Sequence, residues 1–180
     1  MVDFGFGRKK QMIYPIVKFG DPVLEKPAAS VTAFDDDIKK LVEDMFESMY
    51  AARGVGLAAP QIGISKRIAV VDVTFKENPD AKLVLINPEI IIKEGRQRGS
   101  EGCLSIPEFR EDVTRAKTVT VRAQDVHGKF FEHTGEDLLA RALLHETDHL
   151  NGKLYISHIS ALKRDLIKRK IRKLVKAGEW

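Results

Sequence analysis

The sequence predicts an α+β fold in one domain, with β-strands packed around a central helix, one helix before them and one after. Apolar residues first recur at helical spacing after residue 35, β-branched apolar runs then fill residues 67–133, and helical spacing returns from residue 137. The chain has 180 residues, of which 43% are hydrophobic and 31% charged, and these values suit a folded chain with one core.

Residues 1–11 show no hydrophobic periodicity, and Met12 reads as a second beginning of the chain. We therefore expect residues 1–11 to be an N-terminal extension, either an alternative start or an added leader. Residues 12–160 then form the body of the domain, and residues 161–180 form a basic helix packed on it. One Cys cannot make an internal disulfide, and no apolar run suits a membrane span or a signal peptide. We therefore expect a cytoplasmic protein with no membrane partner.

The first helix is predicted to begin at Asp35-Asp36-Asp37, where acidic side chains favour a helix N-terminus, and to end at Gly54. Strands are predicted over residues 67–73, 83–92 and 118–123, and a turn and residues 129–133 complete a hairpin with the last of them. The apolar face of the first helix comprises Ile38, Leu41, Val42, Met45, Phe46 and Met49.

A second helix is predicted from about residue 137 to residue 152, and a final one over about residues 161–176. Residues 161–180 hold eight basic residues against two acidic ones, a net charge of +6, whereas the whole chain carries +4. Such a helix is either simply solvated or attracted to RNA. Its predicted apolar stripe comprises Leu162, Leu166, Ile167, Ile171, Leu174 and Val175.

The second helix contains the segment His145-Glu146-Thr147-Asp148-His149. Residues four apart share one helix face, so His145 and His149 can bind one metal ion while Glu146 reaches a water molecule beside it. The alternative is a polar stripe without a ligand. Two histidines do not complete a catalytic site, which normally has three protein ligands. In the metzincin pattern the third ligand position is Tyr155, a poor ligand, so we expect the third ligand elsewhere in the chain.

Cys103, in the segment Glu101-Gly102-Cys103-Leu104-Ser105, is a candidate for that ligand, because one Cys with two His is a known catalytic set. The alternative is a buried core cysteine beside a turn. Upstream, residues 54–61 read GVGLAAPQ, which matches no phosphate-binding pattern. This stretch is either a helix end followed by a turn of small residues, or bare backbone that lies against a ligand with the Gln61 amide as a donor.

Together, GVGLAAPQ at 54–61, EGCLS at 101–105 and HETDH at 145–149 resemble the peptide deformylase family, whose motifs GxGxAAxQ, EGCLS and HExDH occur in this order. The likeness extends to RIAVVD at 67–72, LINPE at 85–89, IPEFR at 106–110 and LNGK at 150–153. It covers nearly everything from Met12 to the final helix. Leu144, where many members have Gln, is a departure that touches no ligand.

The resemblance implies a metal-dependent hydrolase that removes the N-formyl group from the formylmethionine of new polypeptides, with residues 12–160 as the catalytic domain. Cys103, His145 and His149 would hold one divalent ion, Fe²⁺ by family preference, with Zn²⁺, Ni²⁺ or Co²⁺ as alternatives. Glu146 would exchange the proton of the attacking water, and Gln61 with the Leu104 N–H would stabilise the formyl oxygen. The implied substrate-binding residues are Val55, Gly56, Gly102, Arg110, Leu138 and Ala142.

Further expectations concern partners and supporting residues. The partner is the formyl-Met nascent peptide, the final helix resembles one used for ribosome (rRNA) docking, and we expect a monomer. Glu101 or Asp148 could pair with Arg115 or Arg141 to hold the site rigid, the alternative being ordinary surface ion pairs. The rival function is an HExxH metalloprotease that cleaves peptide bonds, but it gives no reason for EGCLS or GVGLAAPQ. A catalytically silent relative would lack Glu146 or a ligand.

Overall fold

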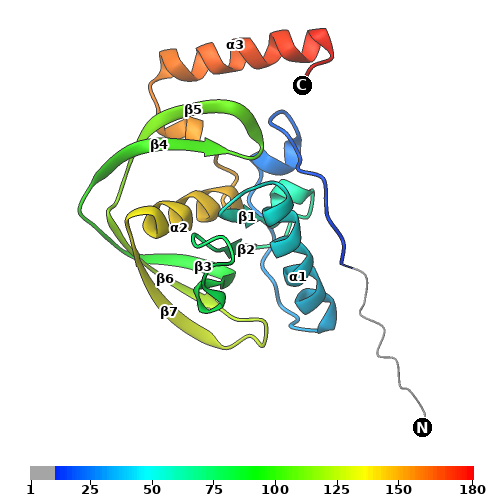
Figure 1. Ribbon diagram of the computed structural model, residues 1–180, viewed down its shortest axis with the longest axis vertical. Helices are drawn as coiled ribbons and strands as arrows, with labels where there is room; N and C mark the ends of the chain where they lie inside the picture. The colour runs from blue at the N-terminus through cyan, green and yellow to red at the C-terminus, as the bar shows by residue number, and fades with distance from the viewer. Residues whose placement is uncertain (1–10) are drawn as a thin grey trace.

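A computed structural model describes residues 11–180 of the chain, so the predicted leader lies outside the described residues except for Gln11. Within this range the chain forms an α+β fold, as predicted (Figure 1). The helices are α1 (Asp36–Ala51), α2 (Asp137–Leu150) and α3 (Ala161–Ala177). The strands are β1 (Gly56–Ala58), β2 (Ile68–Val71), β3 (Leu83–Glu94), β4 (Gln97–Cys103), β5 (Ile106–Arg115), β6 (Thr118–Gln124) and β7 (Phe130–Glu136).

The strands form two antiparallel sheets. The main sheet has the order β1-β2-β3-β6-β7, and β4 pairs with β5 in a separate hairpin sheet. In Figure 1, α2 lies between the two sheets. This helix contacts every strand of the main sheet, and the hairpin sheet delivers Cys103 to it from the other side.

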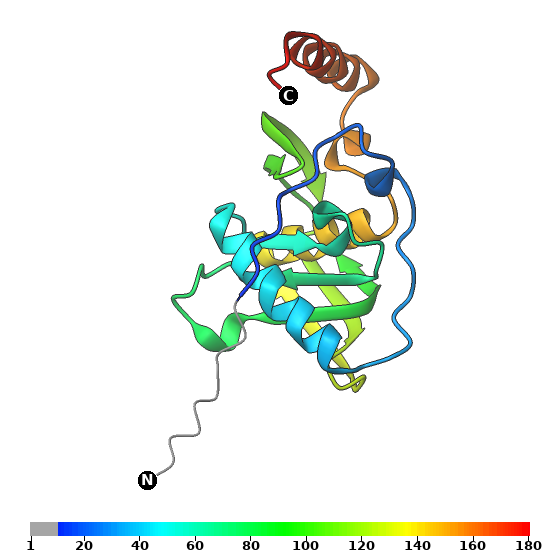
Figure 2. The ribbon, with the colours of Figure 1, turned by 90° about the vertical axis from the view of Figure 1, so that its right-hand side faces the viewer.

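The two faces of the main sheet are covered by different helices. Ile68 and Val70 of β2 pack in a cluster with α1, whereas Ala69 and Val71 pack in a cluster with α2. Figure 2 shows α1 lying across the sheet. Because side chains alternate between the faces of a strand, a strand buried on both faces reads as a continuous apolar run, which is how β2 appears in the sequence.

Helix α1 begins where the acidic run predicts. The Asp35 side chain caps it by accepting a hydrogen bond from the Ile38 N–H at 3.0 Å. Met45 and Met49, at the centre of its apolar face, are fully buried. The helix ends at Ala51, three residues before the predicted end, and Gly54 is bonded back to the Met49 carbonyl.

Helix α2 has two chemically different faces. Ala140, Leu143 and Leu150 pack on the main sheet, and Leu138, Arg141 and His145 line a cleft on the opposite side. The HExxH segment therefore lies on a helix anchored through its apolar face, with its polar face directed at the hairpin sheet.

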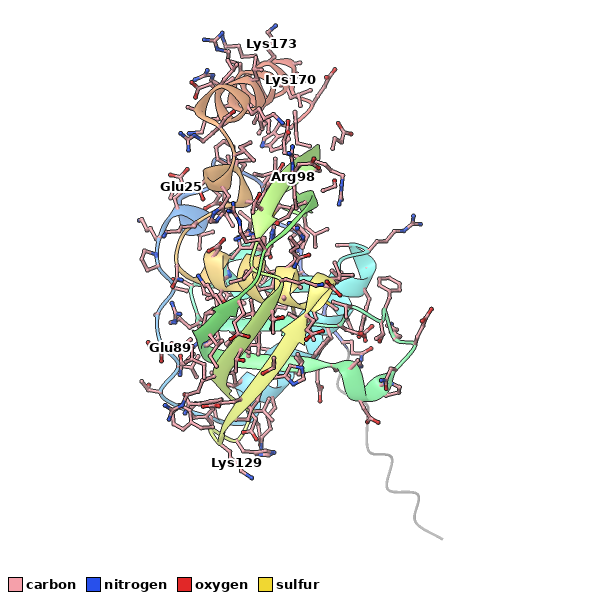
Figure 3. The ribbon with its side chains drawn as sticks, turned by 90° about the vertical axis from the view of Figure 1, so that its left-hand side faces the viewer. Glu25, Glu89, Arg98, Lys129, Lys170 and Lys173 are labelled. Carbon is pink, nitrogen blue, oxygen red and sulfur yellow. The ribbon has the colours of Figure 1, made fainter. Side chains whose placement is uncertain are left out.

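For helix α3, the predicted apolar stripe was partly wrong. Ile167 and Ile171 are buried, but Leu162, Leu166 and Val175, which were assigned to the same stripe, are 72%, 48% and 55% exposed. The helix touches the body only along one narrow line beside the hairpin sheet, so a six-residue stripe has no surface to cover it. Figure 3 shows Lys170 and Lys173 pointing away from the rest of the molecule. Among residues 11–180, no helix is long and apolar enough to cross a bilayer.

Candidate metal centre and active site

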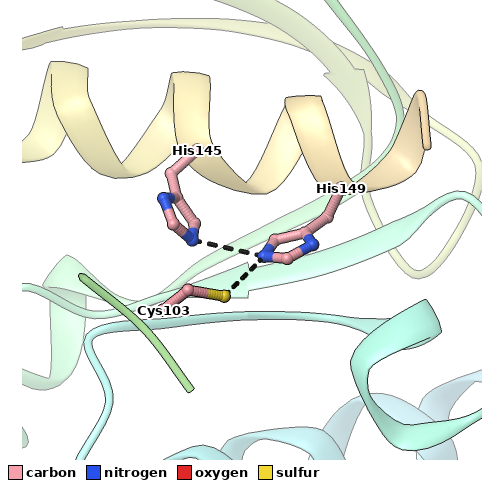
Figure 4. A group of neighbouring side chains, drawn as sticks. All are labelled: Cys103, His145 and His149. Carbon is pink, nitrogen blue, oxygen red and sulfur yellow. Dashed lines mark hydrogen bonds between the residues drawn. The ribbon is translucent and has the colours of Figure 1, made fainter. Parts of the chain in front are cut away.

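Three ligand atoms converge at the centre of the molecule (Figure 4). His145 and His149 project from adjacent turns of α2, and their Nε2 atoms lie 3.2 Å apart. Cys103, at the end of β4, brings its Sγ to 3.2 Å from the His149 Nε2. The three donor atoms all lie within 4.8 Å of one another. Ligand atoms that share one ion at about 2.0–2.3 Å must lie roughly 3–4 Å apart, so this set fits a divalent metal ion.

The electrostatics of this site favour the thiolate form that a metal ligand needs. Burial raises the pKa of the Cys103 thiol, but the neighbouring imidazoles of His149 and His145 outweigh burial and lower this pKa to about 5. Burial lowers the pKa of His145, but its hydrogen bonds to Cys103 and Glu101 raise it well above the ordinary value. Both shifts express the attraction between a thiolate and the imidazoles around it.

The orientation of His145 is fixed by Glu101. The carboxylate Oε1 of Glu101 lies 2.7 Å from the His145 Nδ1, which leaves Nε2 directed at the other ligands. The side chain of Glu101 is 4% exposed, and Arg115 and Arg141 donate hydrogen bonds to it at 2.6 and 2.7 Å. Burial raises the Glu101 pKa, but the bonds from His145 and Arg115 outweigh it and hold this pKa well below its usual range.

The same network reaches the end of α2 and the turn after it. Arg115 also donates to the Asp148 Oδ2 at 2.6 Å, and the His158 Nε2 lies 2.7 Å from that oxygen. The arginine side chain is 4% exposed and that of Asp148 is 19% exposed. The expected pairing of Glu101 and Asp148 with Arg115 and Arg141 is therefore present. Glu101, Arg115 and Arg141 are buried and Asp148 is partly buried, so these are not ordinary surface ion pairs.

Glu146 lies next to the ligands without a partner of its own. The residue is 4% exposed, and within the described part of the chain its Oε2 has no hydrogen-bond partner. A Cβ atom built on Gly56 would lie 2.3 Å from the Glu146 Oε1, so only glycine at this position leaves room for the carboxylate. Burial raises the Glu146 pKa. A buried carboxylate with a raised pKa and an unpartnered oxygen is a candidate for accepting and donating a proton.

Gln61 presents a donor to the same space. Its Oε1 accepts a hydrogen bond from the Ala58 N–H at 3.0 Å, which directs its Nε2 towards the Cys103 Sγ at 3.5 Å and the Ser105 Oγ at 3.3 Å. The residue is 1% exposed. Leu104 follows Cys103 in the turn between β4 and β5. Both predicted oxyanion donors therefore lie beside the predicted metal ligands.

A cleft of about 700 Å³ opens in front of these residues. It collects every predicted substrate-binding residue, and Cys103, His145, Glu146, Gln61 and Leu104 also line it. The predicted residues along this cleft are Val55, Gly56, Gly102, Arg110, Leu138 and Ala142.

The structure adds detail that the sequence did not supply. The Arg110 guanidinium lies over Gly102, where an added Cβ would be 3.0 Å from Nη1, and its Nε donates to the Ser100 Oγ at 3.1 Å. Ile16 and Phe109 also line the cleft and were not predicted. Phe109 belongs to the IPEFR flank, which was a usable signal, whereas nothing in the sequence around Ile16 marks it.

Comparisons with known proteins agree on one family. The sequence model of the polypeptide deformylases matches residues 13–165. A peptide deformylase of Acidobacterium capsulatum is 64% identical over 169 residues, which are 94% of this chain and 99% of that protein. One from Alkalilimnicola ehrlichii is 49% identical over 92% of this chain and 93% of its own length.

Solved structures give the same result. A crystal structure of a peptide deformylase from Legionella pneumophila has a TM-score of 0.86 and 46% identity, and the match covers 93% of this chain and 98% of that one. A peptide deformylase from Plasmodium falciparum matches with a TM-score of 0.84 and 34% identity over 91% of this chain and 96% of that one.

Proposed function

Because this chain belongs to the polypeptide deformylase family, it is a metallohydrolase that removes the N-formyl group of new polypeptides, and we propose how its residues divide the work. The observation that carries the proposal is the buried Glu146 carboxylate, unpartnered on one oxygen within the described residues, beside three converging metal-ligand atoms. The proposal takes residues 12–160 as the catalytic domain and residues 161–180 as a helix packed on it.

Cys103, His145 and His149 hold one divalent ion. By family resemblance we propose Fe²⁺, and the donor set is equally compatible with Zn²⁺, Ni²⁺ or Co²⁺. When bound, such an ion polarises the formyl oxygen and lowers the pKa of a coordinated water. The thiolate form of Cys103 and the Glu101 contact that orients the His145 ring favour binding, because both ligand atoms are already directed at the site.

Glu146 moves the proton. Its carboxylate accepts a proton from the water that attacks the formyl carbon, and it delivers that proton to the departing amine nitrogen. Its raised pKa suits this exchange, because a more basic carboxylate accepts the proton of the water more readily. The products are formate and a free N-terminal amine.

Gln61 and the Leu104 N–H stabilise the negative charge that develops on the formyl oxygen. The carbonyl of Gln61 is already bonded to the Ala58 N–H, so its amide hydrogens stay aimed at the reacting centre. Donors fixed in a water-poor site need no reorganisation during the reaction, and removing one typically costs about 3 kcal/mol.

The formylated peptide lies extended along the cleft. Backbone groups at Val55 and Gly102 bond to it as to an added strand, and its methionine side chain enters a pocket formed by Val55, Leu138 and Ala142. Leu138 is 51% exposed beside the cleft, which leaves apolar surface free for that side chain. Arg110 lies further along the peptide path.

The protease alternative lacks a third downstream ligand. The Tyr155 hydroxyl donates to the Phe109 carbonyl at 3.1 Å, His158 is bonded to Asp148, and Asp165 is exposed on α3. The donor that completes the set comes from Cys103 on the hairpin sheet.

The proposed reaction is tested by its products. We expect the zinc-loaded protein to release formate from formyl-Met-Ala-Ser and to leave Met-Ala-Ser and acetyl-Met-Ala-Ser intact. Release of free amino acids or dipeptides from the unformylated peptide, detected by mass spectrometry, would establish peptide-bond cleavage and overturn the proposal.

We also propose that α3 docks the enzyme on ribosomal RNA, and that the enzyme acts as a monomer in the cytoplasm, where nascent chains emerge. Most of the basic residues of α3 are exposed, and Lys170 and Lys173 point outward (Figure 3). A chain cut after Ser160 would also lose the packing of Ile167 and Ile171. The double variant Lys170→Glu/Lys173→Glu, which reverses two exposed charges, is therefore the better test. Sedimentation with ribosomes should weaken for this variant and not for Glu89→Lys on the body, and equal binding of both would refute docking.

A further inference from the structure

The chain turns back at the end of α3 and packs Trp180 against the body. Gly178, at φ 73°, ends the helix in the left-handed conformation that reverses the chain. The Trp180 Nε1 then donates to the Phe19 carbonyl at 3.0 Å. Its ring lies 6.3 Å from that of Phe109, tilted by 59°, and the Lys18 Nζ lies 5.5 Å from its centre. Trp180 therefore has three partners, and all lie outside its own helix.

Two of these partners, Phe109 and Phe19, connect Trp180 to the wall of the cleft. Phe109 lines the cleft directly. The Phe19 N–H donates to the Ser105 carbonyl at 2.8 Å, so Phe19 links Trp180 to the residue that precedes the wall segment. Trp180 thus contacts Phe109 of the segment 105–110 directly and reaches Ser105 through Phe19, and Pro107, Glu108 and Arg110 of the same segment line the cleft.

The segment needs such support. Glu108 has φ 69°, a left-handed conformation that a residue with a side chain adopts rarely, and it lies between two residues of the wall. Glu108 itself lines the cleft. The Trp180 ring, in contact with the Phe109 ring, can give this wall support.

We propose that Trp180 is a positioning residue that holds the wall formed by residues 106–110, and so determines how tightly the enzyme binds the peptide residues that follow formyl-Met. The inference rests on the proposed function, since it concerns the far part of the same cleft. Trp180 acts through Phe109 and does not touch the metal ligands, so it affects substrate binding and leaves the chemical step unchanged.

The test separates binding from chemistry. For Trp180→Ala, we expect KM for a formyl-Met tetrapeptide to rise about tenfold at unchanged kcat, and KM for formyl-Met-Ala to stay within about twofold of wild type. Trp180→Phe should restore the wild-type KM, because an aromatic ring again fills the site. Val175→Ala, at an exposed position of the same helix, is the matched control.

Trp180 is the only tryptophan in the chain, so its fluorescence reports on this contact alone. Adding the formyl-Met tetrapeptide to zinc-loaded Glu146→Gln protein should change its emission, and adding formyl-Met-Ala should not. The proposal would be overturned if Trp180→Ala left KM unchanged, or if it raised KM equally for short and long substrates. It would also be overturned if adding the tetrapeptide left the tryptophan emission unchanged. If wild-type protein released no formate at all, the proposed function would fail, while the fluorescence titration would still decide the role of Trp180.

Discussion

At the scale of single residues, the site depends on Gly56, a glycine that leaves room for a catalytic side chain. Gly56 precedes no sharp turn, and its φ is not left-handed. What it provides is space, because Glu146 occupies the volume where a Cβ would lie. This explains why a glycine is found within a buried strand, where it otherwise weakens packing.

Gly56→Ala tests this account. The added methyl group should displace the Glu146 carboxylate and lower kcat by roughly 100-fold or more, since proton transfer by a positioned group contributes that much. Bound zinc should stay at one ion per chain, because the methyl group meets Glu146 and no ligand. The double variant Gly56→Ala/Glu146→Gln should be no slower than Glu146→Gln alone. Additive losses in kcat would mean that Gly56 acts by another route.

At the scale of elements, four segments are joined through Arg115 and Glu101. Strand β4 supplies Glu101, β5 supplies Arg115, α2 supplies His145 and Asp148, and the turn before α3 supplies His158. The network holds the hairpin sheet against α2 at the point where the two must share a metal ion.

Asp148→Asn removes one charge from that network. We expect zinc affinity to fall about 10-fold to 100-fold, because such supporting hydrogen bonds orient the ligands. Competition with a chelator measures the affinity. Asp112→Asn is the control, since Asp112 pairs with Arg98 at 3.4 Å on the exposed side of the hairpin sheet and should change nothing. Equal zinc affinity in both variants would remove the supporting role of Asp148.

The elements also show how far sequence reasoning reaches. Helices α1 and α2 and strands β2, β3, β6 and β7 were predicted, because their apolar periodicity reflects packing on one sheet. The hairpin β4–β5 was missed. Strand β4 reads QRGSEGC, without an alternating apolar face, because its inner residues pack on Arg141 and Arg115 rather than on a core.

The site was predictable to a similar extent. The ligands, Glu146 and Gln61 stand in motifs whose spacing carries their chemistry, and the structure brings them together. His158 and Trp180 make contacts between distant segments, and no local pattern marks such contacts. The exposure of Leu162 and Leu166 was missed for the same reason, since a stripe on a helix does not show how much of it finds a surface.

At the scale of the whole molecule, α1 is tied to the main sheet through a buried hydrogen bond to a carboxylate. The Tyr50 hydroxyl donates to the Asp72 Oδ2 at 2.6 Å. Burial raises the Asp72 pKa, but the bonds from Tyr50, Thr74 and the Lys76 N–H outweigh it and lower this pKa to about 2. Because the folded value lies below the ordinary 3.8, the stabilisation is complete above about pH 4 and is lost as pH falls towards 2.

Tyr50→Phe should therefore reduce the free energy of unfolding by about 2 kcal/mol at pH 7. The difference from wild type should shrink as pH falls below about 4, because the carboxylate that accepts the bond becomes protonated. Urea unfolding of the metal-free proteins at several pH values measures this difference in the free energy of unfolding. Tyr155→Phe is the control, because the Tyr155 hydroxyl donates to a neutral carbonyl. Its loss of unfolding free energy should therefore not depend on pH. If the loss of unfolding free energy in Tyr50→Phe were equally independent of pH, the hydrogen bond of Tyr50 to the ionised Asp72 would not be its cause.

The central claim, that a metal held by Cys103, His145 and His149 acts together with Glu146 to remove a formyl group, is tested most directly by one measurement. Formate release from formyl-Met-Ala-Ser is compared between wild-type and Glu146→Gln proteins that carry equal zinc. The account predicts that kcat falls by about 10²–10⁴ in the variant, because the water loses its proton acceptor while the ligands remain. Undiminished formate release by Glu146→Gln at equal zinc content would contradict it.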